Sequence, residues 1–511
     1  MAALDSLNNI LGTAYTLSEC PLLAPLLQQC ITDGWDFGRI FARCRANWSS
    51  PDPSEAWQVV DERVERDQRA RDSALDSRTN TIVRPALPPR RLWDLGANRV
   101  IPTPWWPSPY AAVSHSWMFD SQLQHVVTAI NNYEWPVPIP SDTTLDRIRI
   151  ELLNLGYACV WLDVLCLRQR GDDQYEHLRR DEWLTDVPTI GAVYHPNMPI
   201  VHYYSGLGRP FRIEDLDSER HWLNRAWTLQ EISQSDVIAG ITPDSPLVDR
   251  IPHDSETGII IDPVQRRFYD TLSELVSRSQ EVGSVFLILG SMRHRHATNE
   301  LDKIAGLAYL LKGSTLPPYV VGQDCELAWD ALVKAILPRF RGDLIFLFPL
   351  PGNGRFRCYP SWSQIKSADQ LPRFGDMLAP VVFNEVRGCY RYTGYRFDDC
   401  KVVGLDALPA SGVQRRGELH IQTNGQLYCL PVFAPHSELI ANDSYTVVSA
   451  ASHEIWLIGR PYGVTTIARR PYARIEKIST VRATPDRAVP FSERFGRHHF
   501  VEHHLKECYF V

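Results

Sequence analysis

The stretch YACVWL at residues 157–162 is a continuous apolar run that stops at Asp163. Runs of this length and composition are typical of strands that are buried on both faces, as in parallel sheets. The segments around it are strand-like at 110–113 (YAAV) and 200–204 (IVHYY) and helix-like at 122–131, 144–155 and 182–193. Because strands and helices alternate, the sequence predicts an α/β fold with a mostly parallel sheet flanked by helices.

Three polar loops follow these strands directly: Ser114–Trp117, Asp163–Arg168 and Ser205–Gly208. In open parallel sheets, ligands bind beyond the carboxyl ends of the strands. We therefore expect the three loops to lie at one rim of the sheet and to form the binding site there.

The segment WLNRAWTLQEI at 222–232 predicts a single helix. Leu223, Trp227 and Glu231 are spaced four residues apart, so they would lie along one face of that helix. Burial on this face would raise the pKa of Glu231 unless a partner compensates. Glu231 is then either held by a hydrogen bond, to a backbone amide or to Arg225, or available for chemistry.

The rest of the chain divides at the proline-rich ALPPRR stretch and again after residue 313. Asn424-Gly425, between two alternating runs, predicts a β-hairpin. We predict four regions: a helical accessory region at 1–85, the α/β domain at 90–313, a mixed connecting region at 314–387, and a β-rich domain with a tail at 388–511.

Composition excludes several classes of protein. The net charge of -7 over 511 residues provides no basic surface for nucleic acid. The 11 cysteines lack a C-x-x-C pair, which argues against a disulfide framework and a zinc ribbon. The N-terminus does not resemble a signal peptide, and no apolar run is long enough to span a membrane. We expect a cytoplasmic protein.

Three blocks resemble the fungal heterokaryon-incompatibility (HET) domain: YAAVSHSW at 110–117, WLDVLCLRQ at 161–169 and NRAWTLQEI at 224–232. The likeness extends over roughly residues 90–365 and includes the stretch RHATNELDKIAGLAYLL at 295–311. It departs from the family pattern at Arg168 and at His115-Ser116. The resemblance implies a role in fungal non-self recognition and programmed cell death, acting by self-association or with a partner incompatibility protein.

The HET domain is in turn similar to the Toll/interleukin-1-receptor (TIR) domain, a flavodoxin-like sheet. In many TIR proteins a glutamate four residues after a tryptophan cleaves NAD⁺, and Trp227 and Glu231 have this spacing. The resemblance therefore implies NAD⁺ as substrate, with no cofactor or metal and with Glu231 catalytic. The residues implied to bind the substrate are Ser114, His115, Trp117, Asp163, Arg168 and Trp227.

Other interpretations stay open. The same blocks could form the core of a non-catalytic module that signals by self-association. Cys166 with His115 as base and Asp163 as its orienting group would suit a hydrolase, although an apolar setting makes a thiol inert. Asp163 could also simply bond the amides of its own turn. The His499–His503 segment matches a metal motif, but too few residues follow it to supply a third ligand downstream.

Overall fold

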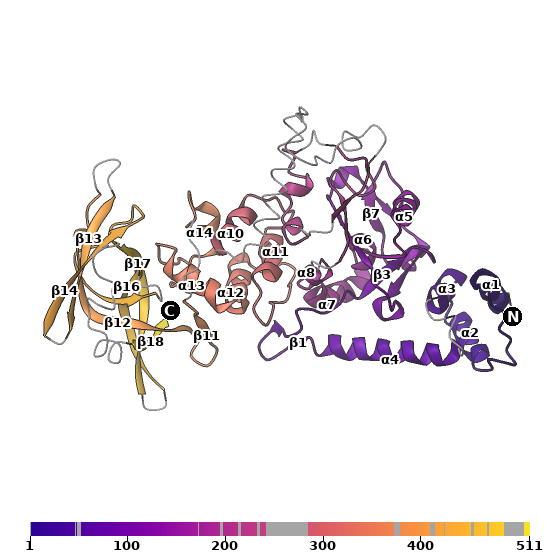
Figure 1. Cartoon of the computed structure of the whole chain (residues 1–511), viewed down its shortest axis with the longest axis horizontal. Coiled ribbons are helices and arrows are strands. Elements are labelled where there is room, and N and C mark those ends of the chain that lie inside the picture. The colour runs from indigo at the N-terminus through magenta and orange to yellow at the C-terminus, as the bar shows by residue number, and fades with distance from the viewer. Residues whose placement is uncertain are drawn as a thin grey trace, which may run out of the picture. The chain divides into compact units, whose positions relative to one another are not determined.

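The structure is a computed structural model, and it divides the chain into two compact units. Unit 1 comprises Met1–Gln280, His294–Leu310 and Thr315–Gly322, and unit 2 comprises Glu281–Arg293, Leu311–Ser314 and Gln323–Val511. Figure 1 shows both units and labels many of their helices and strands. The described residues are 2–45, 48, 53–171, 173–194, 198–212, 216–231, 236–241, 285–372, 379–408, 414–423, 425–450, 454–467, 470–484 and 505–511.

Unit 1 begins with four helices, drawn in indigo and violet in Figure 1. They are α1 (Ala2–Leu11), α2 (Leu23–Thr32), α3 (Phe37–Arg45) and α4 (Pro53–Asp72), followed by the two-residue strands β1 (Leu75–Asp76) and β2 (Thr81–Ile82). A small apolar core that includes Leu7, Leu23 and Ile40 packs the first three helices together. α4 is rich in charged residues, and Arg71 near its end pairs with Asp186 (3.5 Å), the last residue of the later helix α7 (Glu176–Asp186).

The sheet of unit 1 has the strand order β10-β9-β5-β8-β3-β4. Its strands are β3 (Arg91–Asp94), β4 (Arg99–Pro102), β5 (Ala111–His115), β8 (Cys159–Leu162), β9 (Ile200–Tyr203) and β10 (Asp236–Ile238). The first four in this order are parallel, whereas β3 and β4 are antiparallel. β5, β8 and β9 are buried along their whole length. The prediction of an α/β fold with a mostly parallel sheet is confirmed.

Two of the predicted helices of unit 1 are present. α5 (Leu145–Asn154) is capped by the Thr144 hydroxyl and ends just before Gly156, whose φ is +87°. The 182–193 segment is divided between α7 (Glu176–Asp186) and α8 (Ile190–Val193), with Pro188 in the break. Unit 1 also contains the short helices η1 (Thr103–Trp105), α6 (Asp163–Cys166) and η4 (Asp173–Tyr175) and, later in the chain, the longer helix α11 (Leu301–Leu311).

The predicted helix at 122–131 is wrong. This segment forms a 3-10 turn η2 (Asp120–Gln122), the strand β6 (Leu123–Val126) and a second turn η3 (Ala129–Asn131). Asn132 and Tyr133 both have positive φ and reverse the chain, so that β7 (Val137–Pro140) pairs antiparallel with β6. The β-branched run from Val126 to Thr128 favours this extended conformation.

The predicted single helix at 222–232 is also wrong within the described residues. Two 3-10 turns, η5 (Trp222–Asn224) and η6 (Trp227–Gln230), are separated by the extended residue Arg225 (ψ 141°). His296 accepts a hydrogen bond from Ala226 N (2.9 Å) and donates one to Asn224 O (2.6 Å). These bonds occupy backbone groups that a continuous helix would pair internally, so Leu223 is separated from the turn that follows. Within that turn, η6, there are three residues per turn, so Trp227 and Glu231 do not share a face either.

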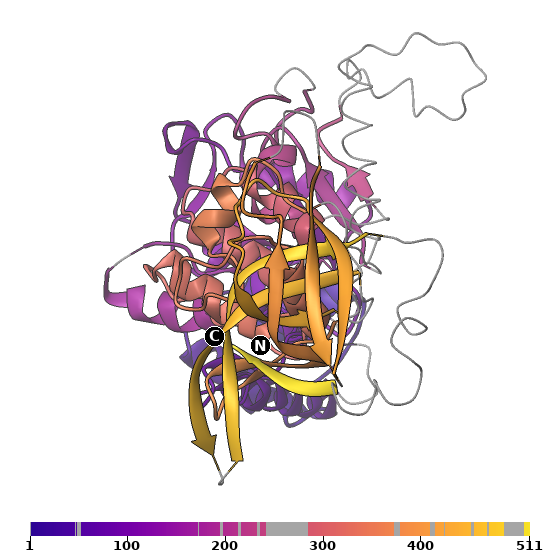
Figure 2. The ribbon, with the colours of Figure 1, turned by 90° about the vertical axis from the view of Figure 1, so that its left-hand side faces the viewer.

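The described residues of unit 2 form four helices and an eight-stranded, almost entirely antiparallel sheet, whose orange and yellow strands stand out in Figure 2. The helices are α10 (Val285–Arg293), α12 (Cys325–Ala335), α13 (Pro338–Phe346) and α14 (Trp362–Ser367). The strands are β11 (Val382–Asn384), β12 (Cys389–Val403), β13 (Arg415–Thr423), β14 (Gln426–Ala434), β15 (Ser444–Ser449), β16 (Ile455–Ile467), β17 (Arg470–Ala483) and β18 (Leu505–Phe510). The sheet closes on itself because the long strand β12 pairs with both β13 and β15.

The predicted hairpin at Asn424-Gly425 is confirmed by the pairing of the residues on either side. Thr423 lies opposite Gln426, and Gly425 has a φ of +75°. The end of the chain, predicted as a tail, forms strand β18 at 505–510, which pairs with β12 and β17. The His499–His503 segment lies outside the described residues.

None of the helices in the described part of the chain is both long enough and apolar enough to cross a membrane. The longest, α4, has 20 residues and is dominated by charged side chains. The apolar residues of the other helices pack against the two units instead, as Ile148 of α5 and Trp329 of α12 show by their complete burial.

Candidate functional site

Strand β5 ends at the point of the sheet where the strand order reverses. The chain passes from β5 to β8 on one side of it and then returns to β9 on its other side. In open sheets of this kind, the carboxyl end of such a strand is where ligands bind. Ser114 and His115 are the last residues of β5, and both are buried.

Ser114 joins the end of β5 to the segment that follows β9. Its hydroxyl donates a hydrogen bond to the carboxylate of Glu231 and accepts one from Trp222 Nε1 (2.6 Å). Trp222 is fully buried and packs edge-on against the rings of His202 and Tyr204, at the end of β9. A chain of two hydrogen bonds therefore runs from an indole N–H through a hydroxyl to a carboxylate.

The carboxyl group of Glu231 lies in an environment that disfavours its charge. Burial raises its pKa to about 7, and the nearby negative charge of Asp163 acts in the same direction. The hydrogen bond from Ser114 and the positive charges of His115 and Arg295 lower it, but they do not outweigh burial. Near neutral pH, Glu231 is therefore close to the midpoint of its titration, as is typical of a general acid or base.

His115 and Asp163 form a second pair beside this chain. His115 Nε2 donates to Asp163 Oδ1 (2.7 Å), and Trp117 Nε1 donates to the other carboxylate oxygen (2.9 Å). Burial alone would lower the pKa of His115, but the charge of Asp163 outweighs it and raises the pKa. Burial would likewise raise the pKa of Asp163, but His115 holds it below the usual range. The two groups form an ion pair whenever His115 is protonated, and each stabilises the charged form of the other.

Asp163 also accepts a hydrogen bond from the backbone N–H of Val164 (2.7 Å), the first amide of its own turn. Asp163 therefore bonds an amide of its own turn, as the structural interpretation expected, and it also contacts His115. Five of the seven sequence-predicted site residues therefore lie in two neighbouring groups, Ser114 with Glu231 and, one residue further along β5, His115 and Trp117 with Asp163. No protein-family model, curated protein or solved structure matches this chain.

The third predicted loop lies at the same edge of the sheet but makes other contacts. Gly208 O accepts a hydrogen bond from Thr143 Oγ1 (3.2 Å), and the Ser205 hydroxyl donates to Arg212 O (3.1 Å). Gly208 is therefore tied to the segment before α5 and Ser205 to Arg212, and neither hydrogen bond leads to Glu231.

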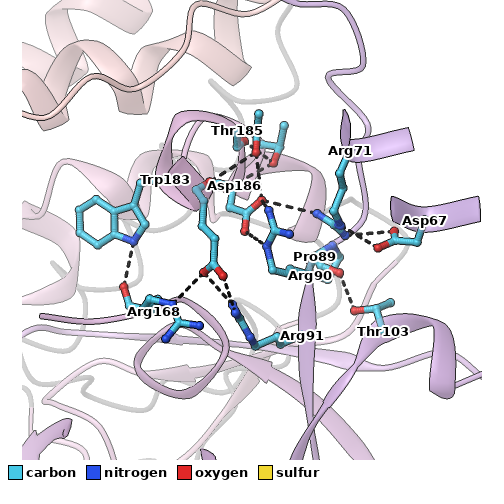
Figure 3. Close-up of polar contacts among 12 residues, drawn as sticks. Asp67, Arg71, Pro89, Arg90, Arg91, Thr103, Arg168, Trp183, Thr185 and Asp186 are labelled. Atoms are coloured by element: carbon cyan, nitrogen blue, oxygen red, sulfur yellow. Dashed lines mark hydrogen bonds and ion pairs between the residues drawn. The ribbon is translucent and has the colours of Figure 1, made fainter. Parts of the chain in front are cut away.

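Arg168, which the resemblance implied as a substrate-binding residue, lies in a different group of charges. It pairs with Glu134 (2.7 Å) and Glu182 (3.5 Å), and its guanidinium stacks on the ring of Trp135. Figure 3 shows Arg168 among Arg91, Trp183 and Asp186, where its carbonyl accepts from Trp183 Nε1 (2.9 Å). These contacts give Arg168 a structural role at the base of α7.

Trp227 is half-buried, and its side chain hydrogen bonds to Asp302 near the start of α11. η6 is a 3-10 turn with three residues per turn, so Trp227 and Glu231, which are four residues apart, do not lie one above the other as the helical spacing implied. Trp222, five residues earlier, is the tryptophan connected to Glu231, through Ser114.

Cys166 does not have the environment of a nucleophile. It is buried, and its sulfur accepts a hydrogen bond from Leu162 N (3.5 Å). Burial raises the pKa of its thiol to about 12, so almost none is ionised at neutral pH. The geometry therefore argues against the Cys/His hydrolase.

Sequence reasoning missed Arg295, which is buried and donates hydrogen bonds to Arg225 O (2.6 Å) and Thr228 Oγ1 (2.8 Å). Burial lowers its pKa to about 10, although the charge of Glu231 acts in the opposite direction. Arg295 is the first residue of the HET-like stretch at 295–311, and this resemblance is the feature of the sequence that could have pointed to it. Arg295 holds the η5–η6 segment in place, and its positive charge lowers the pKa of Glu231.

Proposed function

We propose that this chain is a HET-domain protein of fungal non-self recognition and that it cleaves NAD⁺ at Glu231. The observation that carries the proposal is the buried carboxyl of Glu231, with a pKa of about 7 and the neutral Ser114 hydroxyl as its hydrogen-bond partner. Ser114, Asp163 and Glu231 come from the three HET-like blocks. Contacts join the first block to each of the others, from Ser114 to Glu231 and from His115 to Asp163.

The strand order supports a TIR-like fold for this domain. Numbered along the chain, β5, β8, β9 and β10 are the first to fourth parallel strands, and their spatial order is 2-1-3-4. This is the order of the flavodoxin-like class, in which the ligand lies where the first strand meets the third. In this chain, Ser114 stands at that point.

Cleavage breaks the bond between nicotinamide and the ribose and passes through an oxocarbenium-like transition state, as other glycosidic cleavages do. Nicotinamide leaves as a neutral base, so no acid is needed to protonate it. The ionised carboxylate of Glu231 binds the ribose hydroxyls and stabilises the positive charge that develops on the ring. Water then adds to the ribose and releases a proton. Because Glu231 is 7% exposed, NAD⁺ must displace the groups that cover it.

The test compares nicotinamide release by concentrated full-length protein carrying Glu231→Gln with release by the unchanged chain. Glutamine keeps the shape and can still accept from Ser114, but it carries no charge, so we expect a loss of about 100-fold or more. The control is Glu134→Gln, the same substitution at a carboxylate that pairs with Arg168, and it should stay within about twofold of the unchanged chain. Equal activity in the Glu231 variant would refute the proposal.

The second candidate is a non-catalytic module that acts by self-association. The burial of Ser114, His115 and Glu231 favours it, because buried residues of this kind also stabilise a core. This candidate predicts no NAD⁺ turnover by the assembled protein. It also predicts that Glu231→Gln leaves both assembly and cell death unchanged.

A further inference from the structure

The hairpin formed by β13 and β14 in unit 2 carries a group of metal-binding side chains on one face. The pairing places His420 directly opposite Cys429, and Glu418 is two residues before His420 on the same strand. Since side chains alternate between the two faces of a strand, Glu418 and His420 point the same way. The neighbouring residues along the two strands, Leu419, Ile421 and Leu430, are buried in the apolar core. The side chains of Glu418, His420 and Cys429 therefore lie on the outer face of the sheet.

The side-chain atoms of this group are close enough to share an ion. His420 Nε2 and Glu418 Oε2 are 2.7 Å apart, and one ligand atom from each of the three residues lies within 4.8 Å of the others. A thiolate, an imidazole and a carboxylate together are the donors that Zn²⁺ takes in proteins. Small rotations of exposed side chains bring them to tetrahedral positions.

We propose that Glu418, His420 and Cys429 bind a Zn²⁺ ion on the outer face of the C-terminal sheet. The backbone that positions them is fixed by nine consecutive pairs between β13 and β14, from Arg415↔Ala434 to Thr423↔Gln426. Three protein ligands leave the fourth position of a tetrahedral zinc open to water or to a ligand from another molecule. The proposal is independent of the chemistry at Glu231.

The exposure of the group favours binding from solution. The side chains of Glu418 and His420 are 53% and 27% exposed, and Cys429 is exposed as well. No buried charge has to be created, because the ion and its ligands stay in contact with water. Zinc displaces the proton from the Cys429 thiol and ends the hydrogen bond between His420 and Glu418, so its affinity rises with pH.

Cobalt(II) is the probe, since it replaces zinc and gives a near-ultraviolet charge-transfer band when a thiolate binds it. Full-length protein titrated with Co²⁺ should develop this band to one equivalent, and Zn²⁺ should remove it. The histidine-rich segment at 498–504 could also bind cobalt, but it contains no thiol and cannot produce the band.

The variant Cys429→Ser should lose the band, and His420→Ala should weaken cobalt binding by about tenfold or more. The matched control is Cys325→Ser, which removes the partly exposed thiol on α12 and should leave the band unchanged. Because Cys429 is exposed, its replacement should not alter the thermal midpoint. A folded chain without the band, or a band that survives Cys429→Ser, would overturn the proposal.

Discussion

Two groups of buried or half-buried carboxylates lie in unit 1, and their charges are compensated in different ways. Glu182 and Asp186 on α7 face arginines: Arg91 donates two hydrogen bonds to Glu182 (2.6 and 3.0 Å), and Arg90 donates two to Asp186 (2.8 and 3.1 Å). Figure 3 shows the arginines of this group around Asp186, with Arg71 approaching from α4. Glu231 has instead the neutral hydroxyl of Ser114 as its hydrogen-bond partner, and the described residues provide no ion pair to it.

The difference is visible in the pKa values of the two glutamates. Burial would raise the pKa of Glu182, but the hydrogen bonds from Arg91 reverse the effect and lower it. Burial raises the pKa of Glu231, and the partners present do not reverse it. A carboxylate paired with arginines, such as Glu182, stays ionised and holds elements together. A buried carboxyl without a paired cation, such as Glu231, has a pKa near neutral, which is common among catalytic residues. The comparison therefore supports a structural role for Glu182 and Asp186 and the reactive role that we propose for Glu231.

The largest expected effect is on stability, at the arginine group. Asp186→Ala leaves the guanidinium of Arg90 without its carboxylate and removes one partner of Arg71, so unfolding should become easier by about 3–5 kcal/mol. Urea unfolding of unit 1 measures this. Glu65→Gln, which breaks an exposed pair with Arg69 on α4, is the control and should change little. A small effect of Asp186→Ala would remove the basis for calling this group structural.

The next effect is the pH dependence of stability that Glu231 contributes. Its pKa is about 7 in the folded chain against an ordinary value of 4.5, so between these values the folded state binds the proton and the unfolded state does not. The stability from this group is therefore fully present below about pH 4.5 and is lost as pH rises to about 7. The loss amounts to about 3 kcal/mol.

Glu231→Gln removes this loss. The variant should have nearly the stability of the unchanged chain at pH 5 and should exceed it at pH 8, as measured by urea unfolding at both values. A constant difference between the two chains at all pH values would mean that Glu231 does not titrate in this range.

Ser114→Ala should have a smaller effect on stability and should raise the pKa of Glu231. It leaves the buried N–H of Trp222 without its acceptor, at a cost of about 1–3 kcal/mol. Since the Ser114 hydrogen bond lowers the pKa of Glu231, its loss should move the pH midpoint of activity upward. Ser116→Ala also removes a buried hydrogen bond, to Arg220 O, but does not touch Glu231 and should leave the midpoint unchanged.

The smallest expected effect is that of Arg168→Gln. Its partner Glu134 is partly exposed, and Glu182 retains its pair with Arg91, so the free energy of unfolding should fall by only about 1 kcal/mol. Nicotinamide release should be unchanged, because the ion pairs of Arg168 are with Glu134 and Glu182 rather than with the carboxylates of the proposed site. A selective loss of NAD⁺ affinity without loss of stability would return Arg168 to the site.

The parts of the fold that the sequence predicts well are those determined by local patterns. The apolar run at 157–162 becomes β8 at Cys159–Leu162, and Thr144 and Gly156 delimit α5 as their chemistry suggests. The Asn424-Gly425 turn likewise determines the register of β13 and β14, and with it the opposition of His420 and Cys429. Counting outward from that turn would have shown this pair from the sequence alone.

The parts that it predicts poorly depend on contacts between distant residues. The segment at 222–232 has helical spacing, yet His296 and Arg295, some 70 residues away, bind its backbone and break the helix. The environment of Glu231 depends on Ser114, 117 residues earlier, and no periodicity reveals that contact. The proximity of these residues was suggested by the three HET-like blocks rather than by the physics of any one segment.

The most direct test of the reactive role of Glu231 is the pH dependence of kcat/KM for nicotinamide release from NAD⁺, measured on concentrated full-length protein. The ionised carboxylate is the active form, so kcat/KM should rise with pH and reach half of its maximum near pH 7. The midpoint should move upward in Ser114→Ala. A half-maximum near the ordinary value of 4.5, or a rate that does not change with pH, would contradict the account.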